Sequence, residues 1–279
     1  MRSSTSRSTS RRAAVLLLVG CAELRSNYRC EASSECTSPV SDEVGVCEPN
    51  GWCSFADPGC PSGRRYGDLA GEGLAGDCAT PLISLRASTS TSLATGDAVT
   101  IDVPAAVREG DLLWLALYAS VQDVTLSPPA GWTPLADLTG VGIYHVFWLH
   151  RTAGASEPGS ATFGFGTNVV HSAILAAYAN VTAGDPLDGQ VVANVVGNPF
   201  TAASFTTTVP NTLLVLTVAN EAGDGETWTA PAGMTMRADT GVLALFDAPA
   251  PDAGPTGPRE ATCSLGGEGS VAFVALEPN

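Results

Sequence analysis

The segment Leu112-Leu113-Trp114-Leu115-Ala116-Leu117-Tyr118 decides the fold of this chain. It is a short apolar run that directly follows the turn residues Glu109-Gly110-Asp111. A run of this length between turns is typical of a central β-strand that is covered on both faces. Further short apolar segments follow between Pro- or Gly-rich turns, and they predict strands rather than helices. The predicted strands are 98–103, 112–118, 143–150, 160–165, 172–178, 204–209, 213–218, 242–246, 261–265 and 271–276.

The central run has a counterpart in the second half of the chain. Four segments recur at offsets of 98 to 102 residues, a drift that small turn insertions and deletions explain. The matched pairs are 110–115 with 211–216, 129–133 with 231–235, 158–165 with 258–265, and 172–178 with 270–276. We therefore predict an all-β, jelly-roll-like β-sandwich at 82–279, built from two internal pseudo-repeats at about 98–181 and 204–279. Two separate small domains are the alternative, and we favour one sandwich because each half is short of strands to cover its own apolar faces.

The N-terminus predicts export. Four arginines and no acidic residue precede the apolar run 13–19, which is too short to span a bilayer and fits the h-region of a signal peptide. The sequence Leu18-Val19-Gly20-Cys21 then resembles the bacterial lipobox. This resemblance implies that 1–20 is a lipoprotein signal peptide and that Cys21 is lipidated. The chain would then be a membrane-anchored lipoprotein at the outer membrane or cell surface, with an unanchored secreted protein as the alternative.

The cysteines also favour an exported protein. Six of the eight lie close together, at Cys30, Cys36, Cys47, Cys53, Cys60 and Cys78. The intervening sequence has too few large apolar residues to hold itself together, which predicts three disulfides in a stapled spacer at 21–81. Six cysteines allow 15 pairings, so the connectivity stays open. A zinc site is the weaker alternative, because this segment has no Cys-x-x-Cys pair and no histidine.

Two resemblances support this organisation. The sequence Cys47-Glu48-Pro49-Asn50-Gly51-Trp52-Cys53-Ser54-Phe55 is similar to a Cys-rich module near the N-terminus of many predicted bacterial surface lipoproteins. Gly110-Asp111-Leu112-Leu113, Pro129-Ala130-Gly131-Trp132-Thr133 and Ala177-Tyr178-Ala179-Asn180-Val181 resemble jelly-roll-like domains of secreted bacterial and phage tail-associated proteins. These resemblances imply a spacer carrying a domain for extracellular binding or display. They transfer no catalytic motif.

Charge excludes several functions. All 13 basic residues are arginine and the net charge is −15, which argues against a nucleic-acid partner. The absence of lysine excludes a lysine Schiff base and a P-loop. Without residues 1–20, nine arginines face 28 acidic residues, a net charge of −19. Attachment to the membrane would therefore depend on the N-terminal lipid rather than on electrostatic attraction.

The sequence contains few candidate catalytic residues. His145 and His150 lie five residues apart on one predicted strand, so they face opposite sides and cannot bind one metal ion. Cys263 occupies a position that matches Phe163 in the repeat, which predicts a reduced thiol in the core. We predict no catalytic residue, no enzyme and no cofactor. A hydrolase acting on extracellular polysaccharide or protein is the alternative function, because a catalytic triad needs no sequence adjacency.

Two groups of residues are candidates for binding. Trp228 lies near turns and is the tryptophan that we expect to be exposed for stacking on a sugar, whereas Trp114 and Trp148 lie in apolar runs and are expected in the core. Glu221, Asp224 and Glu226 crowd one loop and are candidate calcium ligands. The predicted function is a non-enzymatic, lipid-anchored surface protein for adhesion or for binding a glycan, another ligand or a surface protein.

Overall fold

The computed structural model describes residues 29–38, 43–48, 50–60, 62–140, 143–221 and 225–279. The predicted signal peptide and Cys21 lie outside these residues. Apart from the short 3-10 helix η1 (Ser33–Glu35), every regular element in the described part is a β-strand. The prediction of an all-β fold behind a disulfide-rich segment is confirmed.

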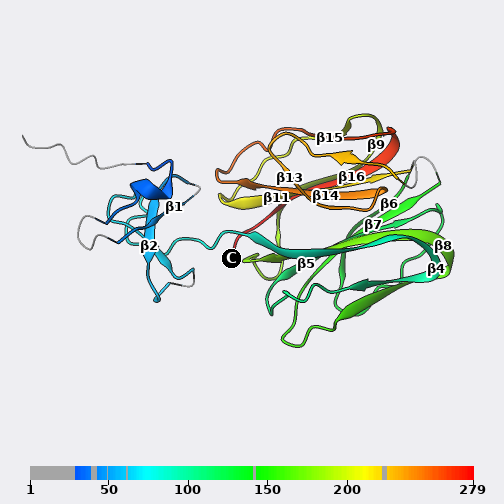
Figure 1. Cartoon of the computed structure of the whole chain (residues 1–279), viewed down its shortest axis with the longest axis horizontal. Coiled ribbons are helices and arrows are strands. Elements are labelled where there is room, and N and C mark those ends of the chain that lie inside the picture. Colours follow the sequence, from blue (N-terminus) through cyan, green and yellow to red (C-terminus); the bar gives the residue numbers. More distant parts are fainter. Residues whose placement is uncertain (1–28, 39–42, 49, 61, 141–142, 222–224) are drawn as a thin grey trace, which may run out of the picture.

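Two five-stranded antiparallel sheets form the body of the molecule (Figure 1). The first has the order β4-β8-β5-β7-β6, with β4 (Ser84–Asp102), β8 (Ser160–Ala179), β5 (Leu112–Ala119), β7 (His145–Thr152) and β6 (Thr133–Thr139). The second has the order β13-β14-β11-β16-β9, with β13 (Thr235–Asp239), β14 (Leu243–Ala250), β11 (Thr212–Asn220), β16 (Gly267–Leu276) and β9 (Leu187–Gly197). The apolar run at 112–118 and its repeat counterpart are the central strands of the two sheets.

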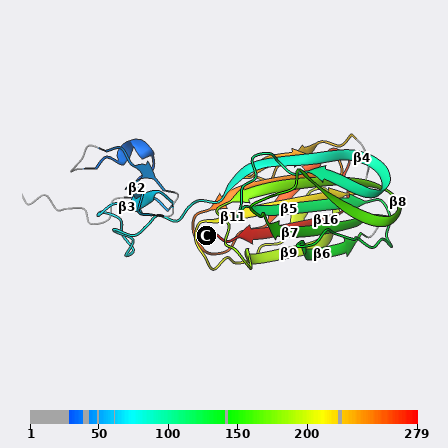
Figure 2. The ribbon, with the colours of Figure 1, turned by 90° about the horizontal axis from the view of Figure 1, so that it is seen from below.

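The two sheets correspond strand by strand. Beside the central strands, β8 and β7 correspond to β16 and β14, and the edge strands β4 and β6 correspond to β9 and β13. The sheets pack face to face with reversed order, so that β13 contacts β4, β14 contacts β8, and β9 contacts β6. Figure 1 shows this stack as two layers, one from each half of the sequence, whereas Figure 2 looks onto the stack, so that strands of the two layers overlap. The two sheets are therefore related by an approximate twofold axis that passes between β5 and β11.

A shared core fills the space between the sheets. It contains Trp114, Trp148 and Tyr178 from the first sheet and Tyr144 directly before β7, together with Val215, Leu245 and Val274 from the second sheet. Hydrogen bonds also cross this layer. Trp114 Nε1 donates to Thr217 Oγ1 at 3.1 Å, and the hydroxyls of Tyr144 and Ser270 lie 3.0 Å apart. The polar atoms of Trp114 and Tyr144 are thus paired inside the layer that joins the two halves.

Each sheet also buries its outer face, although we expected each half to be short of strands that could cover its own apolar faces. Every residue of β5 and β11 is buried. In the first half, the end of β4 and the start of β8 run past β5 and pack Val99, Ile101 and Phe163 over Leu113 and Leu115. In the second half, a small sheet of β10 (Phe200–Ala202), β15 (Arg259–Cys263) and β12 (Trp228–Thr229) covers the outer face. Each half therefore has its own core, and the body has four layers.

Central and edge strands differ in the regularity of their pairing. The four pairings of β5 and β11 with their neighbours are uninterrupted. In the two five-stranded sheets, every pairing that involves an edge strand contains at least one register shift. In β4 there are three, and β6, β9 and β13 each have one in their pairing. Such bulges bend and twist an edge strand locally.

The strand predictions were right for the central strands, but they omitted the edge strands β6, β9 and β13 and failed in two further places. The segments 160–165 and 172–178 belong to one strand, β8. The segment 204–209 is not a strand, although Thr206 forms an isolated bridge with Pro255. The backbone N–H groups of Thr208 and Val209 donate instead to Asp188 Oδ2, at 2.7 and 2.9 Å. The carboxylate therefore satisfies donors that a strand would offer to its neighbour.

The N-terminal region is a small disulfide-linked module, here called the Cys-rich module (residues 29–79). In the described part of this module, one sheet has three short strands, β1 (Val46–Cys47), β2 (Cys53–Ala56) and β3 (Arg64–Tyr66). Its apolar cluster contains only Trp52, Tyr66 and Ala79 as buried members. The predicted three disulfides are present as Cys30–Cys47, Cys36–Cys53 and Cys60–Cys78. In Figure 1 this module lies at one end of the body, to which residues 80–83 connect it.

Candidate functional site

Trp228 is not the exposed aromatic that we expected. Its side chain is 5% exposed, and its ring packs 5.4 Å from the ring of Phe200. The indole Nε1 donates to the carbonyl of Gly241 at 2.6 Å. Strand β12 pairs with β15 and so places Trp228 in the outer core of the second half. All five tryptophans are buried, so none of them offers a face for sugar stacking.

The candidate calcium ligands are only partly within the described residues, because Asp224 lies outside them. Glu221 Oε1 accepts the backbone N–H of Ile143 at 3.2 Å. Glu226 is buried, and its Oε2 accepts from Asn220 Nδ2 at 2.7 Å. Among the described residues, the only cluster of three ligand-type side chains is Cys30, Cys36 and Cys47, all of which are in disulfides. Calcium binding therefore stays a prediction.

The three histidines do not form one site. His145 stacks on Phe147 on the outer face of β7, with ring centroids 4.2 Å apart. His150 lies five residues further along the strand, so its side chain is on the other face of β7, the same face as Trp148. This confirms that the two histidines face opposite sides of the strand. His171 stacks on Phe165, and burial lowers its pKa. Burial also lowers the pKa of His150.

Cys263 is a free, buried thiol, as its repeat position predicted. Its Sγ accepts from Asn220 Nδ2 at 3.1 Å and from the backbone N–H of Gly266 at 3.2 Å. Burial and the neighbouring Glu226 carboxylate raise its pKa to about 11, so the thiolate is rare at neutral pH. The expected apolar face ends there, because β15 stops at Cys263 and Leu265 is 61% exposed.

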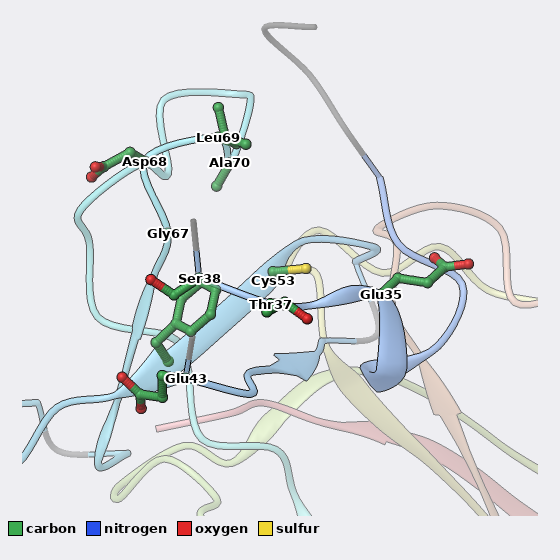
Figure 3. Close-up of a pocket in the computed structure, with 10 residues that line it drawn as sticks. Glu35, Thr37, Ser38, Glu43, Cys53, Gly67, Asp68, Leu69 and Ala70 are labelled. Carbon is green, nitrogen blue, oxygen red and sulfur yellow. The ribbon is translucent and has the colours of Figure 1, made fainter. Parts of the chain in front are cut away.

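A pocket of about 420 Å³ lies in the Cys-rich module (Figure 3). We call it the Phe55 pocket. Strand β2 supplies Cys53 and Phe55 on the pocket side, whereas Ser54 points to the opposite face of the strand. Figure 3 shows Leu69 and Ala70 on one wall and Ser38, Thr37 and Cys53 on the other. Within the described residues, the lining consists of Glu35, Thr37, Ser38, Glu43, Cys53, Phe55, Gly67, Asp68, Leu69 and Ala70.

Two glycines hold the edges of the Phe55 ring. A Cβ atom at Gly45 would lie 2.9 Å from Phe55 Cε1, and one at Gly67 would lie 2.7 Å from Phe55 Cε2. Both separations are shorter than real carbon–carbon contacts, so a side chain at either position would displace the ring. The ring is therefore held at its two edges by backbone, which leaves a ring face as the surface that it can offer to the pocket.

The pocket lining is negative. It contains the carboxylates of Glu35, Glu43 and Asp68, and no basic side chain is among the lining residues that the structure describes. The residue paired with Phe55 across β2 and β3 is Arg65. Its Nε forms an ion pair with Asp57 at 2.5 Å, which lowers the pKa of that carboxyl group. The lining therefore keeps three negative charges without a cation of its own.

On the opposite face of β2, a second arginine is engaged in the same way. Arg64 Nε donates to Ser54 Oγ at 2.8 Å and lies 3.4 Å from Glu48 Oε1. Glu48 is buried and also accepts from the Ser54 hydroxyl. This network compensates Arg64 on the far side of the strand from the Phe55 pocket, so it leaves the negative lining unchanged.

The body also has pockets. One of about 280 Å³ is lined by Trp132 and Arg151, whose guanidinium lies 5.3 Å from the centroid of the Trp132 ring. Arg151 also forms an ion pair with Glu157, so its charge is already compensated. This pocket therefore has neither a free charge nor an available tryptophan face.

The Phe55 pocket was not predicted from the sequence. The two glycines that lie against the Phe55 ring are about ten residues away from Phe55 on either side, so no local pattern connects them to it.

The comparisons with known proteins give no match. No protein-family model, no curated protein and no solved structure matches this chain. Among the residues that the structure describes, none belongs to a helix long and apolar enough to cross a bilayer.

Proposed function

We propose that this chain is an exported, lipid-anchored surface protein that binds a ligand and does not act as an enzyme. The observation that carries the proposal is the Cys-rich module, in which three disulfides and a small core support a pocket. Structural disulfides persist in oxidising compartments outside the cytosol. The lipobox-like sequence that ends at Cys21 supports attachment of the mature N-terminus to a membrane.

The body supports a display role within this proposal. Its strands bury three clusters of apolar residues, and its histidines are divided between two faces of the first sheet. The resemblance to jelly-roll-like domains of secreted proteins is in line with such a role. We place ligand binding in the Phe55 pocket, because every tryptophan is buried and the sugar-stacking surface expected at Trp228 is absent.

The anchor is tested by expressing the full precursor in a bacterium that processes lipoproteins. We expect the wild-type protein in the membrane fraction, with mass spectrometry showing a diacylglycerol-modified Cys21 as its first residue. The Cys21→Ala variant should move to the soluble fraction. The matched control is Cys263→Ala, which removes a different unpaired cysteine and should stay with the membrane. Retention of Met1, or membrane association of Cys21→Ala, would contradict the proposal.

A further inference from the structure

We infer that the Phe55 pocket binds the basic side chain of a polypeptide partner, an arginine or a lysine. This inference rests on the proposed function, because it names the chemistry of the ligand. Two features of the pocket select the same charge independently, namely the carboxylates of its lining and the ring of Phe55.

The first feature is the charge of the lining. Glu35, Glu43 and Asp68 are exposed side chains around an opening that has no basic residue of its own. Glu43 Oε1 accepts the backbone N–H of Ala56 at 3.1 Å, and Glu35 Oε2 accepts that of Glu31 at 2.9 Å. These neutral donors orient the two carboxylates without removing their charge. A positively charged ligand would therefore pair with carboxylates that no basic side chain among the described lining residues neutralises.

The second feature is the ring. The face of an aromatic ring carries the negative part of its quadrupole and attracts cations, whereas the ring edge is positive. The backbone at Gly45 and Gly67 occupies both edges of the Phe55 ring. A ligand in the pocket therefore meets the face rather than the edge, and this preference is again for a cation.

The apolar part of the lining favours a side chain on a polypeptide over a free inorganic cation. Leu69 is 47% exposed and, with Ala70, forms one wall (Figure 3). Next to Glu43, Val44 is 68% exposed and bridges to Thr37 in the lining. Arginine and lysine carry their charge at the end of an aliphatic stem that packs on such surfaces. The exposed rim offers a further apolar surface for the chain that carries the side chain.

The test is a titration of the ¹⁵N-labelled chain from residue 22 to 279, with its three disulfides verified by mass, at about 0.15 M salt. The probe is the peptide acetyl-Gly-Gly-Arg-Gly-Gly-amide. The control probe replaces arginine by citrulline, which has nearly the same shape and no charge. We expect saturable shifts of the amides around Phe55 and Gly67 with the arginine peptide, and at least about tenfold weaker binding of the citrulline peptide.

Matched variants distinguish binding by the pocket from nonspecific attraction to the negative charge of the whole chain. The triple variant Glu35→Gln, Glu43→Gln, Asp68→Asn should bind the arginine peptide about tenfold more weakly. The control triple variant Glu109→Gln, Asp123→Asn, Glu260→Gln removes three exposed acidic groups from the body and should bind within about twofold of wild type. Phe55→Leu retains an apolar side chain without the ring face and should weaken binding about fivefold.

Three results would overturn the inference: equal binding of the citrulline peptide, an equal loss in the control triple variant, or unchanged binding in both pocket variants. The triple variants change only exposed carboxylates, and non-reducing mass and thermal melting confirm their fold. This experiment uses the unanchored chain, so its failure leaves the membrane anchor untouched. Failure of the Cys21 experiment in turn leaves the peptide result standing.

Discussion

The Cys-rich module and the body achieve order by different means. The body has three apolar clusters, one between its sheets and one on each outer face. The module has a single cluster with three buried members, and its chain is closed by three disulfides. The module is therefore stabilised mainly by covalent restriction of its unfolded state, and the body mainly by burial of apolar surface. A pocket with an exposed lining fits the first kind of construction, because little of the module's stability depends on filling that space.

Reduction of the disulfides should have the largest effect of all, because it should unfold the Cys-rich module and leave the body folded. The bridges join cysteines 17, 17 and 18 residues apart, and each contributes about 3 kcal/mol in the loop-entropy treatment. We expect complete loss of amide protection at residues 30–78 under reducing conditions and unchanged protection in β5 and β11. Hydrogen exchange followed by mass spectrometry measures both regions in one sample. Protection that survives reduction in the module would show that its small core suffices.

Truncation of the shared core should have the next largest effect, and only on the body. Trp114→Ala removes a fully buried side chain and should lower the free energy of unfolding by about 3–5 kcal/mol. Trp114→Phe is the control, because it keeps most of the volume and loses mainly the hydrogen bond to Thr217, worth about 1 kcal/mol. Urea denaturation followed by circular dichroism gives both values. An equal loss in the two variants would contradict the packing argument.

Alkaline pH should destabilise the body through tyrosines of the shared core. Burial raises the pKa of Tyr118 and of Tyr144 to about 12. Their pKa in the unfolded chain is 10, so the stabilisation is complete below pH 10 and is lost as the pH rises from 10 to 12. Allowing for partial solvation, the pair should account for about 2 kcal/mol. Urea midpoints at pH 8, 10 and 11 measure the loss, and Tyr144→Phe should reduce it. A stability independent of pH above 10 would contradict the assignment.

The smallest effect concerns Cys263, whose thiol should not react with an alkylating reagent while the body is folded. Cys263 is 5% exposed and has a pKa of about 11, so iodoacetamide at pH 8 should leave it unmodified in the folded body. Reduction followed by alkylation should add six groups in the module and none at Cys263. Adding urea should then expose the remaining thiol. The mass of the intact protein counts these steps, and rapid labelling of Cys263 without urea would mean that the body opens locally.

The same contrast explains how much of the fold the sequence could predict. The central strands were predictable, because β5 and β11 are buried on both faces and consist of continuous apolar runs. The edge strands β6, β9 and β13 were missed, since most of their residues are exposed or only partly buried and their sequences are mixed. The number of disulfides followed from composition, but their pairing depends on three-dimensional proximity, which the order of the cysteines does not encode.

The candidate site was harder to predict for a similar reason. Trp228 lies near turns in the sequence, yet its pairing with Cys263 across two strands buries it, and that pairing joins residues far apart in the chain. The Phe55 pocket arises from the approach of Gly45 and Gly67 to one ring from opposite sides. Neither glycine has a local pattern that connects it to Phe55, so only the folded chain shows the relation.

The register shifts confined to the edge strands have a consequence for molecules held close to one another. A flat, regular edge would present a row of unpaired N–H and C=O groups on which a second molecule could add a strand. The register shifts in all four edge pairings of the two five-stranded sheets bend and twist the edge strands, which makes their free edges less regular. Where copies of the chain meet side by side, this irregularity opposes the addition of strands from one molecule to the next.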